Sequence, residues 1–365
     1  MRGGPVVGLV AGLVALAWRP GLARAAWTQD WPPFALVAGL LAIGLVARDD
    51  GLFEWWGARM GAVSRHGRVV YAVSGVAVVV VTALLNLDTA VAFMTPILVH
   101  AARHRREPVE PWLYATVVLA NAGSLWLPGS NLTNLIVLGH LRMSGMEFVQ
   151  RTVGVALVAS VVGVLTVSLL GRRDLGAFTP PEPVVPLRGR LGPVATAAAL
   201  ALILVSRSPA LPVVAVAAIA VAVRAGQHRL DGRELGGTLA PLSLAGLLGV
   251  AVALGTLGRA SQGIDAWLGH QTTIVTALVA AVATVLVNNL PAASVLAAHP
   301  PAHPVALLVG LNLGPNLFVT GSLAWLLWWR SARAVGVEPR FGRAVTWGVV
   351  VGATTVASAV LVLAL

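Results

Sequence analysis

The stretch NAGSLWLPGSNL (residues 121–132) interrupts a long apolar segment with proline, glycine and small polar residues, and NLGPNLFVTGSL (residues 312–323) does the same near the C-terminus. Proline removes a backbone donor from a helix and glycine tolerates unusual dihedral angles, so each stretch predicts a helix that is broken in its middle. Aligned without gaps, the two stretches pair Asn121 with Asn312. They therefore indicate that the chain contains two related halves.

Composition predicts that these helices lie in a membrane. Of the 365 residues, 57% are hydrophobic and 11% are charged, and the mean hydropathy is +0.84. A soluble domain of this size could not bury so much apolar surface, whereas helices suit a bilayer because they satisfy their own backbone hydrogen bonds. The sequence therefore predicts an all-α polytopic membrane protein. The absence of cysteine excludes disulfides, thiolate catalysis and cysteine metal sites.

Apolar runs of helical length recur along the chain, and each predicts a membrane helix. The expected spans are 5–18, 34–48, 151–170, 192–206, 208–223, 240–257 and 344–364, with an amphipathic interfacial stretch at 51–67. The broken helices are expected at 111–140 and 303–329. Two pairs of apolar arms, 69–101 and 272–299, each have a polar tip between the arms and predict re-entrant helical hairpins.

The order of these elements repeats. A hairpin followed by a broken helix occurs in residues 1–171 and again in residues 208–365, and a linker with a linking helix occupies 172–207. If each hairpin enters and leaves on one side of the membrane, the second half has the opposite orientation to the first. Inverted repeats whose broken helices meet near the bilayer midplane are typical of secondary transporters.

Charge indicates the orientation. Every basic residue is an arginine, and most of the 25 arginines fall in loops on one side of the expected membrane. The positive-inside rule then predicts a cell membrane protein (plasma or inner membrane) with a cytoplasmic N-terminus. The formal charge of +11 is spread over many short loops, which argues against a nucleic-acid partner. The first apolar run also resembles a signal peptide, but an uncleaved helix fits the arginine pattern better.

Polar residues gather where the helices break. Backbone groups that leave a helix cannot face lipid, and half-helix ends carry partial charges, so such a region suits a neutral polar binding site without arginine. The alternative interpretation is that small and polar residues only hold helices together. The candidate substrate-binding residues are Asn86, Thr89, Asn121, Ser130, Asn131, Asn288, Asn289, Asn312, Asn316, Thr320 and Ser322.

Asp88 is the only acidic residue inside the expected spans. A carboxylate at mid-membrane is unfavourable, and such residues usually mark proton or cation paths. Burial favours the neutral, protonated form, which suits a group that loads and releases a proton. We therefore expect Asp88 to couple transport to protons. The alternative is that Asp88 caps the second arm of its hairpin.

Four stretches resemble the arsenite efflux pumps of the ArsB type, which belong to the ion-transporter superfamily that includes the sodium–dicarboxylate symporters. These stretches are LNLDTAVAFMTPILVHA (85–101), ANAGSLWLPGSNLTNLIVLG (120–139), VNNLPAASVLA (287–297) and GLNLGPNLFVTGSLAWLLWWR (310–330). The resemblance implies an inverted-repeat fold with a scaffold part and a moving transport part. It also implies export of arsenite or antimonite, with proton antiport as the usual coupling, and a homodimer and a separate ATPase subunit as possible partners. No pair of histidines has a metal-binding spacing, so no metal or cofactor is expected.

The chain departs from this pattern in two ways. It is shorter than typical members, and its hairpin tips, residues 86–89 and 288–291, lack the Ser-Asn-Thr motif of the sodium–dicarboxylate branch. Proton-coupled arsenite export is therefore favoured, with a sodium/proton antiporter or an organic-anion (dicarboxylate) transporter as the alternative. An intramembrane enzyme is a remote alternative, because Asp88 has no acidic partner in the expected spans.

Overall fold

The computed structural model describes residues 3–139, 143–175, 186–206, 208–227, 231–260, 263–297 and 301–364. Within these ranges the chain is helical and contains no strand. Its elements are α1 (Gly3–Trp18), α2 (Pro20–Asp49), α3 (Leu52–Gly61), α4 (Gly67–Leu84), α5 (Leu87–His104), α6 (Val109–Gly123), η1 (Pro128–Ser130), α7 (Leu132–Gly139), α8 (Gly145–Gly171), α9 (Leu191–Val205), α10 (Ala210–Gly226), α11 (Gly232–Leu239), α12 (Pro241–Ala260), α13 (Ile264–Gly269), α14 (Thr273–Val287), α15 (Asn289–Leu296), α16 (Pro304–Leu313), η2 (Gly314–Leu317), α17 (Leu323–Ala334) and α18 (Phe341–Ala364).

By length and composition, five helical stretches of the described chain could cross a membrane: α2, α4, α8, the run from α11 to α12, and α18. The 30 residues of α2 rise about 45 Å, more than the roughly 30 Å of a bilayer's hydrocarbon core. Helices α1, α9, α10, α14 and α16 are shorter but also apolar. The all-α membrane fold expected from the sequence is therefore confirmed.

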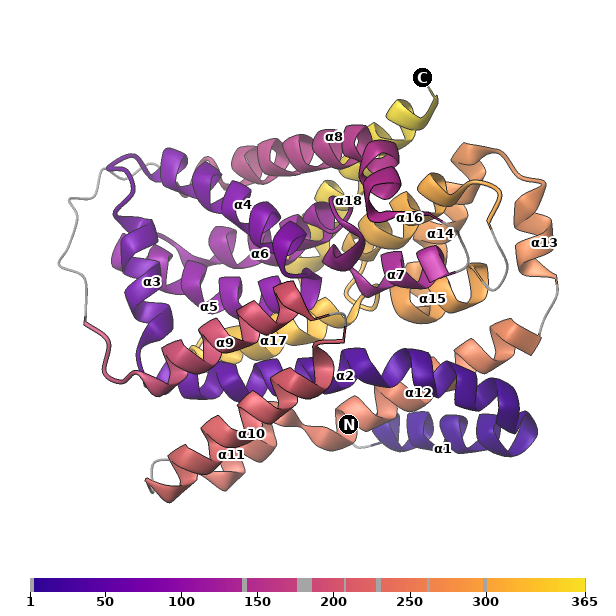
Figure 1. The fold of residues 1–365 in the computed structure, drawn as a ribbon. Helices are drawn as coiled ribbons and strands as arrows, with labels where there is room; N and C mark the ends of the chain where they lie inside the picture. The colour runs from indigo at the N-terminus through magenta and orange to yellow at the C-terminus, as the bar shows by residue number, and fades with distance from the viewer. Residues whose placement is uncertain are drawn as a thin grey trace.

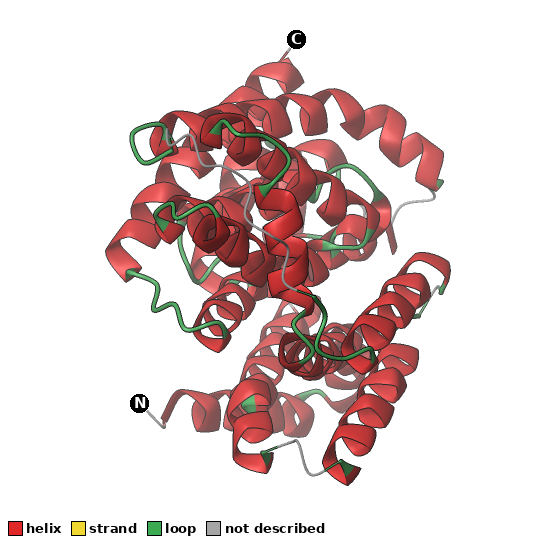
Figure 2. Cartoon of the chain, turned by 90° about the vertical axis from the view of Figure 1, so that its left-hand side faces the viewer, coloured by secondary structure: helices red, strands yellow, loops and turns green. Residues whose placement is uncertain are grey.

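The helices form two groups, which we name the frame and the bundle. The frame consists of α1, α2 and α9 to α12, and α2 is its centre because each of the other frame helices packs against it. The bundle consists of α4 to α8 and α14 to α18. Figure 1 shows α1, α2, α10, α11 and α12 along one side of the molecule, below the bundle, and Figure 2 shows the same division after a 90° turn. Outside both groups, α3 packs on α5 and α13 on α15.

The second arms of the two hairpins connect these groups, because α5 packs on α2 and α15 packs on α12. Within the bundle, the half-helix α17 packs on α5 and the half-helix α7 packs on α15. Each broken helix therefore contacts the hairpin that comes from the other part of the sequence. The frame is interleaved in the same way, since α1 packs on α12 and α10 packs on α2.

Replacing Gly310 with alanine is expected to lower the free energy of unfolding by about 2 kcal/mol. The added Cβ would lie 2.3 Å from the carbonyl oxygen of Ala277 and 2.4 Å from the Cβ of Ala280, so α16 and α14 would have to move apart. The measurement is the thermal unfolding of the purified protein in detergent. Gly237→Ala in α11 is the matched control, because nothing lies within 4 Å of its added Cβ. Equal unfolding midpoints for the two variants would contradict the packing argument.

Two arginines near helix ends, Arg48 and Arg330, connect the frame to the bundle. We name their hydrogen bonds and the ion pair of Arg48 the arginine contacts. Arg48 of α2 donates to the carbonyl oxygen of Ala334 in α17 at 3.2 Å and pairs with Glu234 of α11 at 2.5 Å. Arg330 of α17 donates to the carbonyl oxygen of Leu239 in α11 at 3.1 Å. These residues belong to the side of the molecule that the arginine pattern predicts to be cytoplasmic.

The largest difference from the expected spans concerns α2. It begins at Pro20 instead of residue 34 and continues through the Pro32–Pro33 pair. Prolines inside a helix usually break it, but the first turns of α2 are held by packing, with Ala26 in a buried cluster with Val252 of α12. The short helices α11 and α13 were not expected either.

Most other boundaries agree with the sequence-based expectations to within a few residues. The interfacial stretch at 51–67 contains α3, whose buried side faces α5. The ends of the expected hairpin 272–299 and of the broken helix 111–140, and part of the linker 172–207, lie outside the described residues.

Candidate functional site

Each broken helix is interrupted by a short turn and an extended residue. The turn η1 and the extended residue Asn131 separate α6 from α7, and η2 and the extended residue Ser322 precede α17. Asn131 and Ser322 are also paired by the gapless alignment of the two stretches. The half-helices α7 and α17 therefore begin at equivalent positions, where a helix N-terminus presents partial positive charge.

Asn312 of α16 connects the two broken helices. Its Oδ1 atom accepts hydrogen bonds from Ser124 Oγ and from Asn131 Nδ2, both at 2.7 Å. Its Nδ2 atom donates to Asn134 Oδ1 at 2.8 Å and to the carbonyl oxygen of Leu308 at 2.8 Å. Both the oxygen and the nitrogen of the Asn312 amide are bonded to residues at the break of the first helix. Asn312 therefore fixes the position of α16 relative to the start of α7.

A second amide pair extends this connection. Asn121 Nδ2 donates to Asn316 Oδ1 at 2.9 Å, and Asn316 Nδ2 donates to the carbonyl oxygen of Val118 at 3.0 Å. Asn121 Oδ1 is buried and has no hydrogen-bond partner among the described residues. We name the side chains of Asn312 and its partners, together with this pair, the amide network; its members are Asn121, Ser124, Asn131, Asn134, Asn312 and Asn316.

The amide network is closed to solvent, since none of its six members is more than 4% exposed. It carries no formal charge, and buried polar groups of this kind must find partners within the protein. Ser124 and Asn134 were not among the predicted residues. Each lies three positions after a predicted asparagine, Asn121 and Asn131, which is one helical turn, and that spacing could have identified them.

Ser130 supports the turn between α6 and α7. Its hydroxyl oxygen lies 2.5 Å from the carbonyl oxygen of Ser124 and 2.6 Å from that of Leu127, and the side chain is buried. The two carbonyl groups also accept from Asn134 Nδ2, at 2.8 and 3.2 Å. Ser130, which can donate to one carbonyl group at a time, and Asn134 together therefore serve carbonyl groups that the break in the helix leaves without a helical partner.

The first hairpin tip is capped by Asn86. Asn86 Oδ1 accepts from the backbone N–H of Thr89 at 2.8 Å, which starts α5. The hydroxyl of Thr89 is buried and has no hydrogen-bond partner among the described residues. The cap is therefore Asn86, and the alternative expectation that Asp88 caps this arm is wrong.

The second hairpin tip is tied to the extended segment before α17. Asn288, with φ at +77°, donates from Nδ2 to the carbonyl oxygen of Thr320 at 3.1 Å. The N–H of Asn289 donates to the carbonyl oxygen of Gly321 at 2.8 Å. Thr320 in turn donates from its hydroxyl to the carbonyl oxygen of Val285 at 2.6 Å. This tip and the break in the second helix therefore form one hydrogen-bonded unit.

Asp88 lies in the first turn of α5 and is 8% exposed. Within the described part of the chain, its carboxyl group has no ion-pair partner and no side-chain hydrogen bond. A carboxylate in the first turn of a helix is stabilised by the helix dipole. Asp88 is thus a buried acid without a counter-charge among the described residues.

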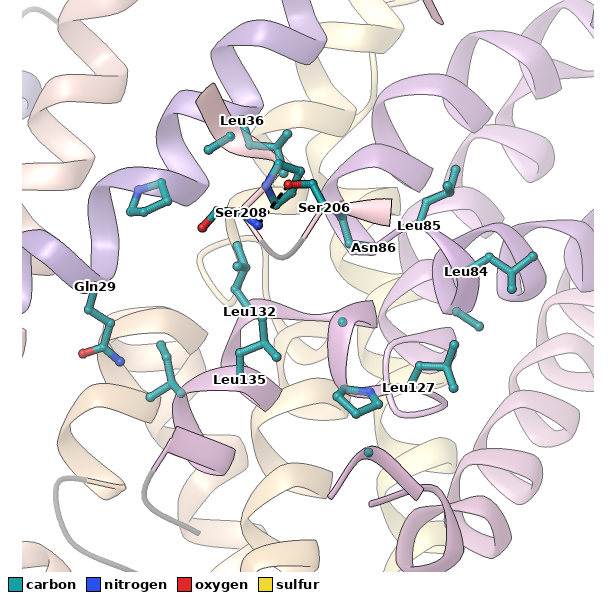
Figure 3. A pocket seen from close by; sticks show the side chains of 18 of the residues that line it. Gln29, Leu36, Leu84, Leu85, Asn86, Leu127, Leu132, Leu135, Ser206 and Ser208 are labelled. Carbon is teal, nitrogen blue, oxygen red and sulfur yellow. Dashed lines mark hydrogen bonds between the residues drawn. The ribbon is translucent and has the colours of Figure 1, made fainter. Parts of the chain in front are cut away.

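A cavity of about 1170 Å³ lies between the frame and the bundle. It is bordered by α2, the tip of the first hairpin, the turn η1, α7, the start of α8, Ser206 and residues 208–210. Figure 3 shows Gln29 on one side of this cavity and Leu84, Leu85 and Leu127 on the other. The lining is mostly apolar, and its polar members among the described residues are Gln29, Asn86, Ser206, Ser208 and Arg259.

The predicted site residues do not surround one common hollow. Asn86 lines the large cavity, whereas the predicted members of the amide network are bonded to one another and buried. Asn288, Asn289 and Thr320 belong to the second tip, and Ser322 is buried beside it with its hydroxyl unpartnered among the described residues.

Sequence reasoning missed several polar residues at and beside the cavity, Ser206 and Ser208 among them. Gln29 and Arg259 line it, so the expectation of a site without arginine does not describe this cavity. Asp30, the neighbour of Gln29, is 1% exposed inside α2. The expectation that Asp88 is the only acidic residue inside a span is therefore wrong. The error follows from starting the second span at residue 34, which left Asp30 in a loop.

Comparisons with known proteins identify transporters. A profile of the citrate transporter family, CitMHS, matches residues 3–320. The arsenical pump membrane protein of Escherichia coli is 24% identical over 94% of this chain and 86% of its own length. The arsenical pump membrane protein of Yersinia enterocolitica is 25% identical over 83% of this chain and 79% of its own length. These matches confirm the resemblance to arsenite efflux pumps.

Two further comparisons agree with these matches. The silicon efflux transporter LSI3 of Oryza sativa subsp. japonica is 25% identical over 42% of this chain and 32% of its own length. The crystal structure of the YdaH transporter of Alcanivorax borkumensis has a TM-score of 0.50 and 17% identity, and covers 95% of this chain and 88% of its own. The YdaH likeness shows the fold, and the sequence matches indicate a membrane transporter, not an enzyme.

Proposed function

Because this chain belongs to the citrate transporter family, CitMHS, we propose that this multi-pass membrane carrier exports arsenite and antimonite in exchange for protons. The similarity to arsenical pump membrane proteins supports the choice of solute. Arsenite near neutral pH is an uncharged trihydroxide, so it needs hydrogen-bond partners but no opposite charge. The cavity offers the amides of Gln29 and Asn86 and the hydroxyl groups of Ser206 and Ser208, which meet that need.

One observation carries this proposal: the break in the first helix borders the cavity. Leu127 and Leu132 of this break line the cavity, and Asn131 between them belongs to the amide network. Backbone that leaves a helix inside a membrane is tolerated where it lines a cavity or is buried in protein. The broken helix therefore brings polar backbone to a hollow of suitable size for a small hydrated solute.

We further propose that residues 1–171 and 208–365 are the two inverted repeats, joined by the linker at 172–207. Helix α7 of the first half packs on α15 of the second, and α17 of the second half packs on α5 of the first. Two inverted and interleaved halves would produce this packing. The same holds for α1 on α12 and α10 on α2. In this scheme the bundle moves against the frame and carries the solute between them.

We place the N-terminus in the cytoplasm and the carrier in the cell membrane, on the strength of the arginine pattern. Gln29, Ser206 and Arg259 then lie toward the outer side, so the cavity that they line opens outward. The arginine contacts of Arg48 and Arg330 close the cytoplasmic side. The structure would thus correspond to the state that releases solute outside.

The test is transport by everted membrane vesicles from cells that lack their own arsenite exporter. We expect labelled arsenite to accumulate when a pH gradient is imposed, and to be lost when the gradient is dissipated. Vesicles without the carrier provide the background. Antimonite should compete with the labelled arsenite, because it is also a neutral trihydroxide. Absence of gradient-driven accumulation would overturn the proposal.

Transport of an organic anion is the second candidate function. The match to the citrate transporter family and the presence of Arg259 in the cavity favour it, because a guanidinium group binds carboxylates well. The same vesicles distinguish the two candidates if labelled citrate replaces arsenite. Citrate transport without arsenite transport would establish the second candidate.

A further inference from the structure

Arg259 is the only charged side chain among the described residues that line the large cavity. It lies near the end of α12, in the frame. Its Nη1 atom donates to the carbonyl oxygen of Gly255 at 2.9 Å, and its Nη2 atom donates to Gln29 Oε1. A guanidinium group has five N–H donors, so these two bonds leave three donors without a partner among the described residues, on a side chain that lines the cavity.

Asp30 supplies the opposite charge beside Arg259. A Cβ atom added to Gly255 would lie 3.0 Å from Arg259 Nη1 and 3.6 Å from Asp30 Oδ2, so both groups border this glycine. Neither carboxylate oxygen of Asp30 has a hydrogen-bond partner within the described ranges, and the side chain is buried. A buried carboxylate without hydrogen bonds depends strongly on a nearby cation, so Asp30 ties Arg259 to this position.

The surroundings of Arg259 are rich in donors. Gln29 has its Oε1 atom bonded to Arg259, which leaves its Nε2 atom free to donate. Ser208 also lines the cavity. The opposite side presents the apolar side chains of Leu84 and Leu85 (Figure 3). One side of the cavity can therefore bind oxygen atoms, and the other side provides apolar contact.

We propose that Arg259 and Gln29 form a release subsite on the frame, where the oxygen atoms of the outgoing solute bind before it leaves the cavity. Asp30 is a positioning residue that holds Arg259 in place and balances its charge. The solute class is small, oxygen-rich, and neutral or singly negative, and Arg259 repels metal cations. This inference rests on the proposed export function, because the subsite lies in the cavity that we assign to the outer side.

A subsite on the frame does not move with the bundle. Removing it should therefore weaken solute binding at the outer face and leave binding at the cytoplasmic face unchanged. The experiment compares two kinds of vesicle that carry the same amount of carrier. Right-side-out vesicles, preloaded with unlabelled arsenite, measure how external labelled arsenite saturates exchange at the outer face. Everted vesicles measure saturation at the cytoplasmic face.

Arg259→Gln leaves Asp30 without its counter-charge and can therefore fail to fold. The double variant Asp30→Asn/Arg259→Gln removes both charges together and keeps the pair neutral. For this double variant we expect the half-saturating concentration at the outer face to rise about tenfold, the effect of losing one charge-assisted hydrogen-bonding group. At the cytoplasmic face we expect a change of less than about twofold.

The outcomes separate the subsite from a structural role. If the double variant saturates like wild type at the outer face, Arg259 is only the counter-ion of Asp30 and the inference is overturned. An equal loss at both faces overturns it as well. If the wild type exchanges no arsenite at either face, the proposed function itself has failed, which the wild-type measurement reveals before any variant is compared.

Discussion

Replacing Asp88 with asparagine is expected to reduce gradient-driven arsenite accumulation in everted vesicles to the level of vesicles without the carrier. Asparagine has nearly the same size as aspartate, so the first turn of α5 should keep its packing. An amide cannot bind and release a proton in the physiological range, whereas the buried carboxyl group of Asp88 has no ion-pair partner in the described chain to prevent it from doing so. The variant therefore tests coupling with little change in structure.

The control for this experiment is Asp174→Asn, which removes an exposed acidic group outside the helices. This variant should accumulate arsenite like wild type. Exchange of labelled for unlabelled arsenite without a pH gradient should survive in Asp88→Asn, because exchange needs no net proton movement. Full gradient-driven accumulation by Asp88→Asn would show that another group carries the proton.

Replacing Asn312 with leucine is expected to lower the free energy of unfolding by at least about 3 kcal/mol, because each buried polar group that loses its partner costs about 1–3 kcal/mol. The change removes the partners of Ser124, Asn131 and Asn134 at once. Leucine has the branched shape of asparagine but a larger volume, so no cavity forms and overpacking adds to the loss of hydrogen bonds. The thermal unfolding midpoint of the purified protein in detergent measures it.

Asn288→Gly is the matched control for the amide network. Asn288 is partly exposed, and its φ of +77° is one that glycine adopts without strain. Its loss should change the free energy of unfolding by about 1 kcal/mol, since only two partly exposed hydrogen bonds are removed, one to the carbonyl oxygen of Thr320 at 3.1 Å and one from the N–H of Leu290 at 3.4 Å. If Asn312→Leu were as stable as Asn288→Gly, the amide network would contribute little to holding the broken helices together.

The breaks in the helices could be predicted from the sequence because their causes are local. Pro128 and Pro315 stand beside glycines and small polar residues, a combination that disfavours a regular helix, and polar tips stand out between apolar arms. The bonds between the breaks could not be predicted in the same way. Asn121 and Asn316 are 195 residues apart in the chain, and no local pattern indicates which amide of one half faces which amide of the other.

Asp30 illustrates a second kind of error. Thr28, Gln29 and Asp30 precede two prolines, and such a cluster resembles a loop when the sequence is read alone. The structure keeps this region helical because α2 packs along α12, where Arg259 provides the charge that Asp30 needs. A buried charge is thus recognisable only once its distant partner is known.

The arginine contacts would influence the equilibrium between the outward-open and inward-open states of such a carrier. Arg48 and Arg330 each donate to a carbonyl oxygen near a helix end, and Arg48 also pairs with the partly exposed Glu234. Water can replace bonds of this kind, so in the orientation that we propose each would stabilise the closed cytoplasmic face by only about 1 kcal/mol. Each such bond would shift the resting ratio of the two openings about fivefold. A few surface bonds could therefore set which opening dominates without slowing the exchange between them.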